Sequence, residues 1–246
     1  KANGGTTTAF SESGNNPGGT HQANTTAGFS IVTYTGTGGA GTVSHGLSAT
    51  PRVIMVKKTS GTSDWNVYHA ANTSSPETDF LVLNTTAATS DNTRWNDTAP
   101  TTSVFSVGTD GAVNGDASTY LAYVFAEKQG YSKFGSYVGN GNANGPFVYT
   151  GFKPAFVMCK NATTAGDNWE IRDNKRNDFN PQGKALYPNL TAAEYNATAI
   201  ATDSLSNGFK VRATDHGLNE SGQTYIYMCF AENPFTTSTG VPATAR

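Results

Sequence analysis

The sequence predicts an all-β fold, arranged as a tandem pair of related antiparallel β-sandwich domains of jelly-roll-like form. Three observations support this prediction. Short runs rich in β-branched and aromatic residues recur along the 246 residues, and clusters of Gly, Asn, Asp, Ser and Thr separate these runs. Many of the runs also occur twice, in the same order, about 100 residues apart.

The duplication defines the predicted domains. "YTGTG" at 34–38 recurs as "YVGNG" at 137–141, "TDGAVN" at 109–114 as "TDHGLN" at 214–219, and "TYLAYVFAE" at 119–127 as "TYIYMCFAE" at 224–232. A period of this length suits one small domain per copy and is too long for a solenoid. We expect an extended N-terminal segment at 1–27, β-sandwich repeat 1 at 28–130, β-sandwich repeat 2 at 131–235 and a C-terminal tail at 236–246.

Each copy should contain roughly six to eight strands. The predicted strands of the first copy lie at 29–36, 52–58, 65–70, 79–86, 103–109 and 119–127. In the last of these, Tyr120 and Val124 point to one face and Leu121 and Tyr123 to the other, so apolar groups on both faces predict a central strand. The best helix signal is at 191–200, where Thr191 could cap the N-terminus.

Composition limits the function classes. Charged residues make up 14% of the chain and the net charge is −2, so the basic stripe of a nucleic-acid-binding protein is missing. No apolar run approaches the roughly 20 residues of a membrane span, so no membrane insertion is expected. Cys159 and Cys229 stand where the first copy has Val56 and Val124, which predicts two core thiols; a disulfide between them stays open. No cofactor is expected.

The sequence offers no constellation typical of an enzyme. Its four histidines, His21, His45, His69 and His216, have no G-x-S-x-G context. The second copy replaces His45 and His69 by other residues, and we expect turn or surface roles for these two. Glycan cleavage needs two convergent carboxylates, and nothing in the spacing of the acidic residues pairs them. We therefore expect no catalytic residues and no enzymatic activity.

The shared pattern T-D-x-x-[VL]-N offers close oxygen ligands in each copy. Asp110 and Asn114 carry it in the first copy, and Asp215 and Asn219 in the second. Calcium binding takes six to eight oxygens. Asx-turns between two strands explain the same residues without a metal, and no metal site is predicted.

One loop is the candidate ligand-binding site. "TRWNDT" at 93–98 places Arg94, Asn96 and Asp97 around Trp95, and the second copy has no tryptophan there. An aromatic ring can stack on the C–H face of a sugar while Asn, Asp or Arg bonds its hydroxyls. The alternative is that Trp95 folds back as a plug on the sandwich edge. Trp65 and Trp169, which occur in both copies, are predicted to be core residues.

A resemblance adds a biological context. "GFSIVTYTGTGGAGTVSHGL", "WNDTAPTTSVFSVGT", "YSKFGSYVGNGNANGPFVYTGFKPAFVM" and "TYIYMCFAENPF" resemble an uncharacterised repeat family found in virion and tail-fibre-like proteins of marine tailed bacteriophages. The likeness covers nearly the whole chain, and it supplies no catalytic residues.

The resemblance implies a non-enzymatic virion structural protein at the surface of the extracellular particle. It would form part of a tail fibre, spike or head-decorating fibre that faces the host. The expected partners are other virion proteins and further copies of the chain, with a trimer as one arrangement. A carbohydrate-binding adhesin module that contacts a host-surface glycan and a glycan depolymerase are the alternatives.

Overall fold

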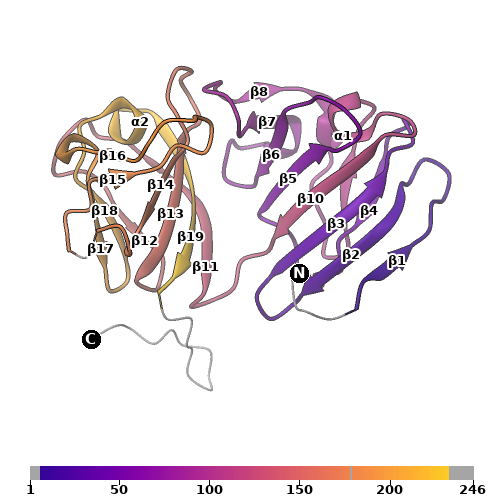
Figure 1. Cartoon of the computed structure of the whole chain (residues 1–246), viewed down its shortest axis with the longest axis horizontal. Helices are drawn as coiled ribbons and strands as arrows, with labels where there is room; N and C mark the ends of the chain where they lie inside the picture. The colour runs from indigo at the N-terminus through magenta and orange to yellow at the C-terminus, as the bar shows by residue number, and fades with distance from the viewer. Residues whose placement is uncertain (1–5, 178, 233–246) are drawn as a thin grey trace. The chain divides into compact units, whose positions relative to one another are not determined.

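The computed structural model of the chain describes residues 6–177 and 179–232 (Figure 1). The predicted all-β class is confirmed, because these residues form antiparallel strands joined by loops and a few short helical turns. The chain divides into two compact units. Unit 1 contains the described residues up to Leu83 together with Thr89–Glu127, and unit 2 contains Asn84–Ala88 and the described residues from Lys128 onward. The predicted tail at 236–246 lies outside the described residues.

Unit 1 contains an eight-stranded sheet in the order β1-β2-β3-β10-β5-β6-β7-β8 and a two-stranded sheet of β4 and β9. The strands are β1 (Thr8–Phe10), β2 (Gly18–Asn24), β3 (Phe29–Thr35), β4 (Gly41–Ser44), β5 (Val53–Lys58), β6 (Trp65–His69), β7 (Asp79–Val82), β8 (Ser90–Asp91), β9 (Val104–Val107) and β10 (Thr119–Phe125). The helical turns are η1 (Pro76–Thr78), η2 (Thr93–Trp95) and α1 (Gly111–Asn114).

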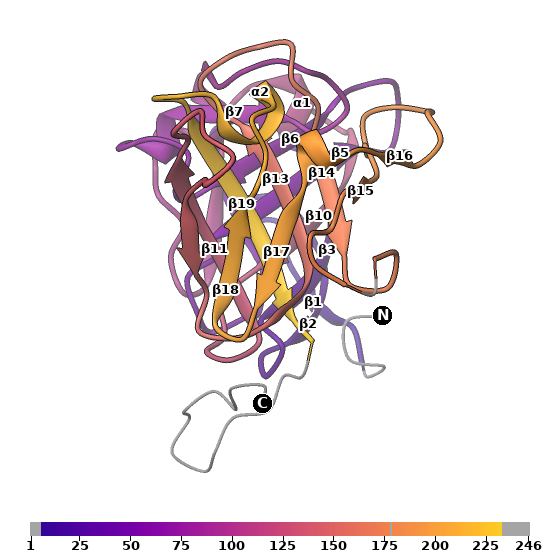
Figure 2. The same cartoon turned by 90° about the vertical axis from the view of Figure 1, so that its left-hand side faces the viewer.

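Unit 2 contains a four-stranded sheet β11-β19-β13-β14, a three-stranded sheet β12-β18-β17 and a two-stranded sheet of β15 and β16 (Figure 2). The strands are β11 (Ser132–Val138), β12 (Phe147–Tyr149), β13 (Pro154–Asn161), β14 (Glu170–Asp173), β15 (Lys184–Ala185), β16 (Tyr195–Asn196), β17 (Thr202–Leu205), β18 (Gly208–Val211) and β19 (Thr224–Ala231). The helical turns are η3 (Thr198–Ile200) and α2 (His216–Asn219).

The main sheets of the two units repeat one strand order. In unit 1, β10 lies between β3 and β5, with β6 next; in unit 2, β19 lies between β11 and β13, with β14 next. The register repeats as well, since Tyr120 is opposite Tyr34 and Tyr225 is opposite Tyr137. The prediction that the recurring phrase forms a central strand is therefore confirmed.

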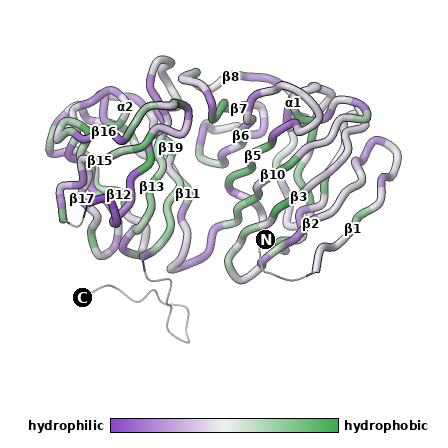
Figure 3. The backbone as a smooth tube through the Cα atoms, in the orientation of Figure 1, coloured by the Kyte–Doolittle hydropathy of each residue, from purple (hydrophilic) through white to green (hydrophobic). Residues whose placement is uncertain are grey.

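Each unit has its own buried core. The unit 1 cluster includes Val56 and Val124, and the unit 2 cluster includes Cys159 and Cys229, the residues that stand at the same places in the second copy. Hydrophobic colour follows the central strands, whereas the connecting loops are largely hydrophilic (Figure 3). Burial of these apolar faces is the main stabilising contribution, because apolar surface is removed from water.

The predicted helix at 191–200 is wrong. Residues 191–194 have no regular structure, Tyr195 pairs with Ala185, and only η3 is helical. The carboxylate of Glu194, within this segment, pairs with Arg176 at 3.1 Å and with Lys184 at 3.7 Å. A ten-residue helix is marginal without an apolar face to bury, and within this segment only Ile200 is buried.

The predicted extended segment at 1–27 contains two strands. β1 pairs with β2, and β2 pairs along its whole length with β3. These two strands are added to the main sheet of unit 1. Among the described residues, the main sheet of unit 2 has no strands that correspond to them.

Candidate functional site

The shared Asp of each copy begins a one-turn helix. The Oδ1 atom of Asp110 accepts a hydrogen bond of 2.8 Å from the N–H of Ala112, and the Oδ1 atom of Asp215 accepts one of 2.8 Å from the N–H of Gly217. Each aspartate is therefore the N-cap of its turn, which satisfies an N–H group that would otherwise lack a partner. The non-metal explanation of this motif agrees with the geometry, although the turn is helical.

The shared Asn of each copy is fully buried and bonds to the backbone. The Oδ1 atom of Asn114 accepts from the N–H of Thr37 at 3.0 Å, and its Nδ2 atom donates to the carbonyls of Gly39 and Gly108 at 2.6 and 2.9 Å. In unit 2 the Oδ1 atom of Asn219 accepts from the N–H of Asn140 at 2.8 Å. Among the described residues no cluster of three or more His, Cys, Asp or Glu could hold a metal ion.

Two tyrosines complete each network. The hydroxyl of Tyr34 donates to the carbonyl of Val113 at 2.6 Å, and that of Tyr120 donates to the carbonyl of Gly111 at 2.7 Å. In unit 2 the hydroxyl of Tyr137 donates to the carbonyl of Leu218 at 2.9 Å, and that of Tyr225 to the carbonyl of His216 at 2.5 Å. The tyrosines on β3 and β10, and on β11 and β19, thus tie α1 and α2 to the main sheets.

The glycines of "YTGTG" and "YVGNG" are explained by close approach of the backbone. A Cβ atom at Gly36 would lie 2.4 Å from the carbonyl oxygen of Gly115, and one at Gly139 would lie 2.2 Å from that of Glu220. Gly38 and Gly141 have φ values of +72° and +66°, which side chains disfavour. The repeated phrase is therefore required by the fold.

The candidate Trp95 is buried. Its side chain is 2% exposed, its Nε1 atom donates to the carbonyl of Asp79 at 3.0 Å, and its ring meets Tyr68 edge-on with centroids 6.0 Å apart. η2 carries it into the unit 1 core, as η3 carries Ile200 into the unit 2 core. The geometry matches the plug alternative, because no face of the ring is presented to a ligand.

The polar residues beside Trp95 do not converge on a shared site. The guanidinium of Arg94 lies 3.5 Å from the centroid of the Phe80 ring, its Nε atom pairs with Asp110 at 3.2 Å, and it donates a further hydrogen bond to Asn66. Asn96 and Asp97 are exposed and have φ values of 52° and 44°. They form the exposed turn after η2, whereas Arg94 is engaged within the unit.

Unit 2 has a buried ion pair that the sequence reasoning missed. Arg172 and Glu170 on β14 are joined by a contact of 2.5 Å between Nη2 and Oε2, with 2% and 4% of their side chains exposed. Burial raises the pKa of Glu170, and Arg172 opposes that shift. The Nε atom of Arg172 is buried without a partner among the described residues. In the sequence, the two charged residues alternate with apolar residues, as in any strand with one exposed face. This pattern did not indicate that the pair is buried.

The candidate histidines and cysteines have structural surroundings. His45 is fully buried, its Nδ1 atom accepts from the N–H of Leu47 at 3.2 Å, and burial lowers its pKa to about 4. His69 is also buried, which corrects the surface alternative for both residues. Cys159 and Cys229 are buried and neither forms a disulfide, so the prediction of two core thiols is confirmed.

The two shared tryptophans differ. Trp169 is 2% exposed, as predicted for a core residue. Trp65 is half-buried and stacks on Tyr123, with ring centroids 5.8 Å apart, so its prediction as a core residue is wrong. In unit 1 this aromatic pair lies on the face of β10 opposite to Tyr120 and Val124.

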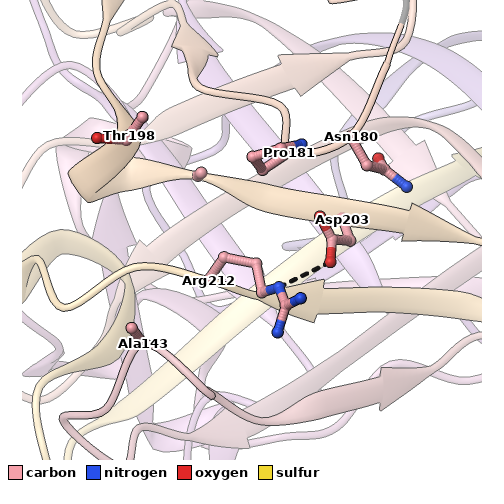
Figure 4. A pocket seen from close by; sticks show the side chains of 7 residues that line it. Ala143, Asn180, Pro181, Thr198, Asp203 and Arg212 are labelled. Carbon is pink, nitrogen blue, oxygen red and sulfur yellow. Dashed lines mark ion pairs between the residues drawn. The ribbon is translucent and has the colours of Figure 1, made fainter.

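Unit 2 carries an open cavity of about 480 Å³ that the sequence did not indicate (Figure 4). Asp203 on β17 and Arg212, just after β18, both line it and point toward each other, with Nε and Oδ2 2.8 Å apart. The remaining lining residues are Ala143, Asn180, Pro181, Thr198 and Ala201. The cavity brings together segments that are up to about 70 residues apart in the chain, from 143 to 212.

A second cavity of about 250 Å³ adjoins the first through Asn180. Its lining includes Phe179, whose side chain is 84% exposed, and Gln182, which is 5% exposed. The other lining residues are Lys153, Asn174, Ser204 and Glu232. We call the two cavities together the unit 2 groove.

Comparisons with known proteins identify a family to which the chain belongs, and the function of this family is not known. No curated protein and no solved structure matches the chain. No helix among the described residues is long and apolar enough to cross a membrane. A family described as a domain of unknown function, DUF7483, matches residues 1–234, which include both copies of the duplicated sequence. The chain therefore belongs to the DUF7483 family of domains of unknown function.

Proposed function

We propose that this protein is a non-enzymatic structural component of a bacteriophage virion, built as a tandem pair of β-sandwich domains that display loops at the particle surface. The repeats would span 28–130 and 131–235. The observation that carries the proposal is the hydrogen-bonding network of Tyr, Gly, Asp and Asn residues, which occurs in both units. The side chains that the two copies share bond to the backbone of their own unit, so they have a structural role. The duplication therefore preserves the residues of this network, whereas the loops differ between the two copies.

A rigid framework with variable loops suits display. Each unit ties its main sheet to a one-turn helix by tyrosine hydroxyls, so the ends of the strands are held while the loops are free to vary. The resemblance of the repeats to virion and tail-fibre-like proteins of marine tailed phages supports the proposed location. Other virion proteins and further copies of the chain are the partners in this proposal, and edge strands offer one means of assembly.

Immunogold labelling of purified virions tests the location. Antibodies against the chain should label a tail fibre, spike or head fibre of the phage that encodes it. Particles that contain no copy of the chain by mass spectrometry would contradict the proposal. Size-exclusion chromatography with light scattering on the purified chain tests the expected homo-oligomer, of which a trimer is one form.

An experimental structure tests the domain organisation. Repeats 28–130 and 131–235 should superpose, each with its own core. A single core shared by both repeats would contradict the tandem sandwich.

A depolymerase is the competing enzymatic function. Incubation of host-envelope polysaccharide with the purified chain should release no new reducing ends if the protein is structural. Release that scales with the amount of chain would show cleavage and overturn the non-enzymatic proposal.

A further inference from the structure

We propose that the unit 2 groove is a binding site for a neutral oligosaccharide that spans at least two sugar rings. The proposal goes beyond the virion role, because it assigns a ligand to a surface of unit 2 wherever the protein is located. It also places the site away from Trp95, the residue that the sequence favoured.

Hydrogen-bonding capacity in the larger cavity comes from the pair of Asp203 and Arg212. The ion pair uses Nε of Arg212 and Oδ2 of Asp203, so the two amino groups of the guanidinium and the Oδ1 atom of the carboxylate lie outside this contact. The side chain of Arg212 is 43% exposed, so its amino groups remain open to a ligand. A guanidinium beside a carboxylate offers donors and an acceptor side by side, which suits two neighbouring hydroxyls that each donate and accept.

Charge favours a neutral ligand. Arg212 is compensated by Asp203, and in the adjoining cavity Lys153 is compensated by Glu232 at 2.7 Å between Nζ and Oε2. A phosphate or carboxylate group would gain from each cation and lose to the carboxylate beside it. A sugar hydroxyl meets no such opposition, so the groove favours hydroxyls over anions.

The smaller cavity supplies an apolar contact. Phe179 is 84% exposed at its rim, and burial of this ring against a ligand would remove apolar surface from water. The C–H face of a pyranose is a suitable partner for such a ring. Because Phe179 lines one cavity and Arg212 the other, contact with both requires more than one sugar ring.

The wall between the two cavities is held in place. The Oδ1 atom of Asn180 accepts from the N–H of Ser204 at 2.9 Å, and its Nδ2 atom donates to the carbonyl of Ser204 at 2.9 Å. The hydroxyl of Ser204 donates to Oε1 of Gln182 at 3.0 Å. These bonds hold the loop that contains Asn180 against β17. A loop that is already held in place loses less conformational entropy when a ligand binds.

Unit 1 lacks the key cation. Arg212 directly follows β18, and in unit 1 Gly108 directly follows β9. A Cβ atom at Gly108 would lie 2.0 Å from the carbonyl oxygen of Thr93, so no side chain fits there. We therefore expect one site per chain, in unit 2.

The test is an array of neutral and acidic oligosaccharides probed with the full chain, followed by calorimetric titration with the best neutral hexasaccharide. Neutral probes should bind with a stoichiometry of one per chain. Phe179→Ala and Arg212→Ala should each weaken the affinity by at least about tenfold. Phe147→Ala is the matched control, because Phe147 is 46% exposed on the same unit and does not line the groove.

Several outcomes would overturn the proposal. They are binding of acidic probes alone, binding of no neutral probe, and neutral binding that survives both groove substitutions in variants with unchanged circular dichroism. Binding lost in Trp95→Phe but kept in Phe179→Ala would move the site to unit 1. If no probe on the array binds but immunogold labels the virions, the groove proposal is rejected and the virion role is kept. If neutral probes bind but the virions contain no copy of the chain, the virion role is rejected and the groove proposal is kept.

Discussion

The rings of Tyr137 and Tyr225 stack with centroids 5.1 Å apart and planes 13° from parallel, and those of Tyr34 and Tyr120 stack at 5.0 Å and 17°. A ring on the last strand of each copy thus lies against a ring on the first. Both hydroxyls in each pair reach backbone carbonyls of the one-turn helix. Aromatic stacking and buried hydrogen bonds are combined at the same place in each unit.

Replacement of Asn114 by alanine should strongly destabilise unit 1. The substitution leaves the N–H of Thr37 and the carbonyls of Gly39 and Gly108 without their partner. Leaving buried polar groups unsatisfied should lower the free energy of unfolding by about 2–4 kcal/mol in urea titrations. Asn92→Ala is the matched control, since the side chain of Asn92 makes no capping bond; equal losses for the two variants would contradict this role.

A methyl group at Gly36 should be poorly tolerated. In Gly36→Ala the new Cβ would meet the carbonyl of Gly115 at 2.4 Å, so we expect a loss of about 2 kcal/mol or more, measured by thermal or urea unfolding. A Cβ at Gly111 meets nothing within 4 Å and lies in a helical turn. Gly111→Ala should therefore be neutral or slightly stabilising, and a reversed order of the two variants would refute the steric account.

Trp95→Ala should destabilise unit 1 by about 3–5 kcal/mol, because it removes a fully buried ring and leaves a cavity. Urea unfolding followed by circular dichroism measures the loss. Trp95→Phe should retain more of the stability because it refills most of the space. A Trp95→Ala variant as stable as the parent chain would show that the ring is not packed in the core.

The stability of the protein should fall as the solution becomes acidic, in part through His45. Burial lowers the folded pKa of His45 to about 4 from 6.5, and nearby His21 acts in the same direction. Between these values the unfolded chain binds a proton that the folded chain excludes, so the free energy of unfolding decreases as pH drops from about 6.5 to about 4. The full loss is about 3 kcal/mol.

Urea titrations at several pH values check this expectation. His45→Asn should flatten the dependence in that window, because asparagine does not titrate and can still accept from the N–H of Leu47. His216 is 73% exposed, so His216→Asn serves as the control. An unchanged slope in His45→Asn would assign the acid sensitivity to other groups.

Both thiols should be inert in the folded protein. Cys159 and Cys229 are buried, and burial raises the pKa of Cys159 to about 12, so little thiolate forms at neutral pH. Ellman's reagent should detect almost no thiol in the native protein and two per chain in concentrated urea. Rapid reaction of a thiol in the native protein would contradict the packing of β13 and β19.

The tertiary structure also explains why both thiols can stay reduced. Cys229 is opposite Val157 and Cys159 is opposite Tyr227, so the two cysteines are diagonal neighbours on adjacent strands. Diagonal Cα atoms on such strands are about 7–8 Å apart, beyond the usual span of a disulfide. The disulfide that the sequence left open is not formed in the structure.

The sequence by itself determined the all-β class, the duplication and the central strand of each copy. These features depend on side-chain alternation and on short repeated phrases, which act over a few residues. The glycines of "YTGTG" and the shared Asp and Asn were visible as a pattern for the same reason, although their partners were not. Burial of Cys159 and Cys229 followed from the valines that they replace.

Only the tertiary structure decided where the loops and their side chains lie. Trp95 could have faced solvent or the core, and the choice depends on the space beneath η2, next to Tyr68 on β6. The groove contains Phe179, Asp203 and Arg212. Phe179 is held near the other two because Asn180 forms a hydrogen bond with Ser204, which lies 24 positions later in the chain. Contacts of this kind arise from the path of the folded chain, and local sequence patterns do not encode them.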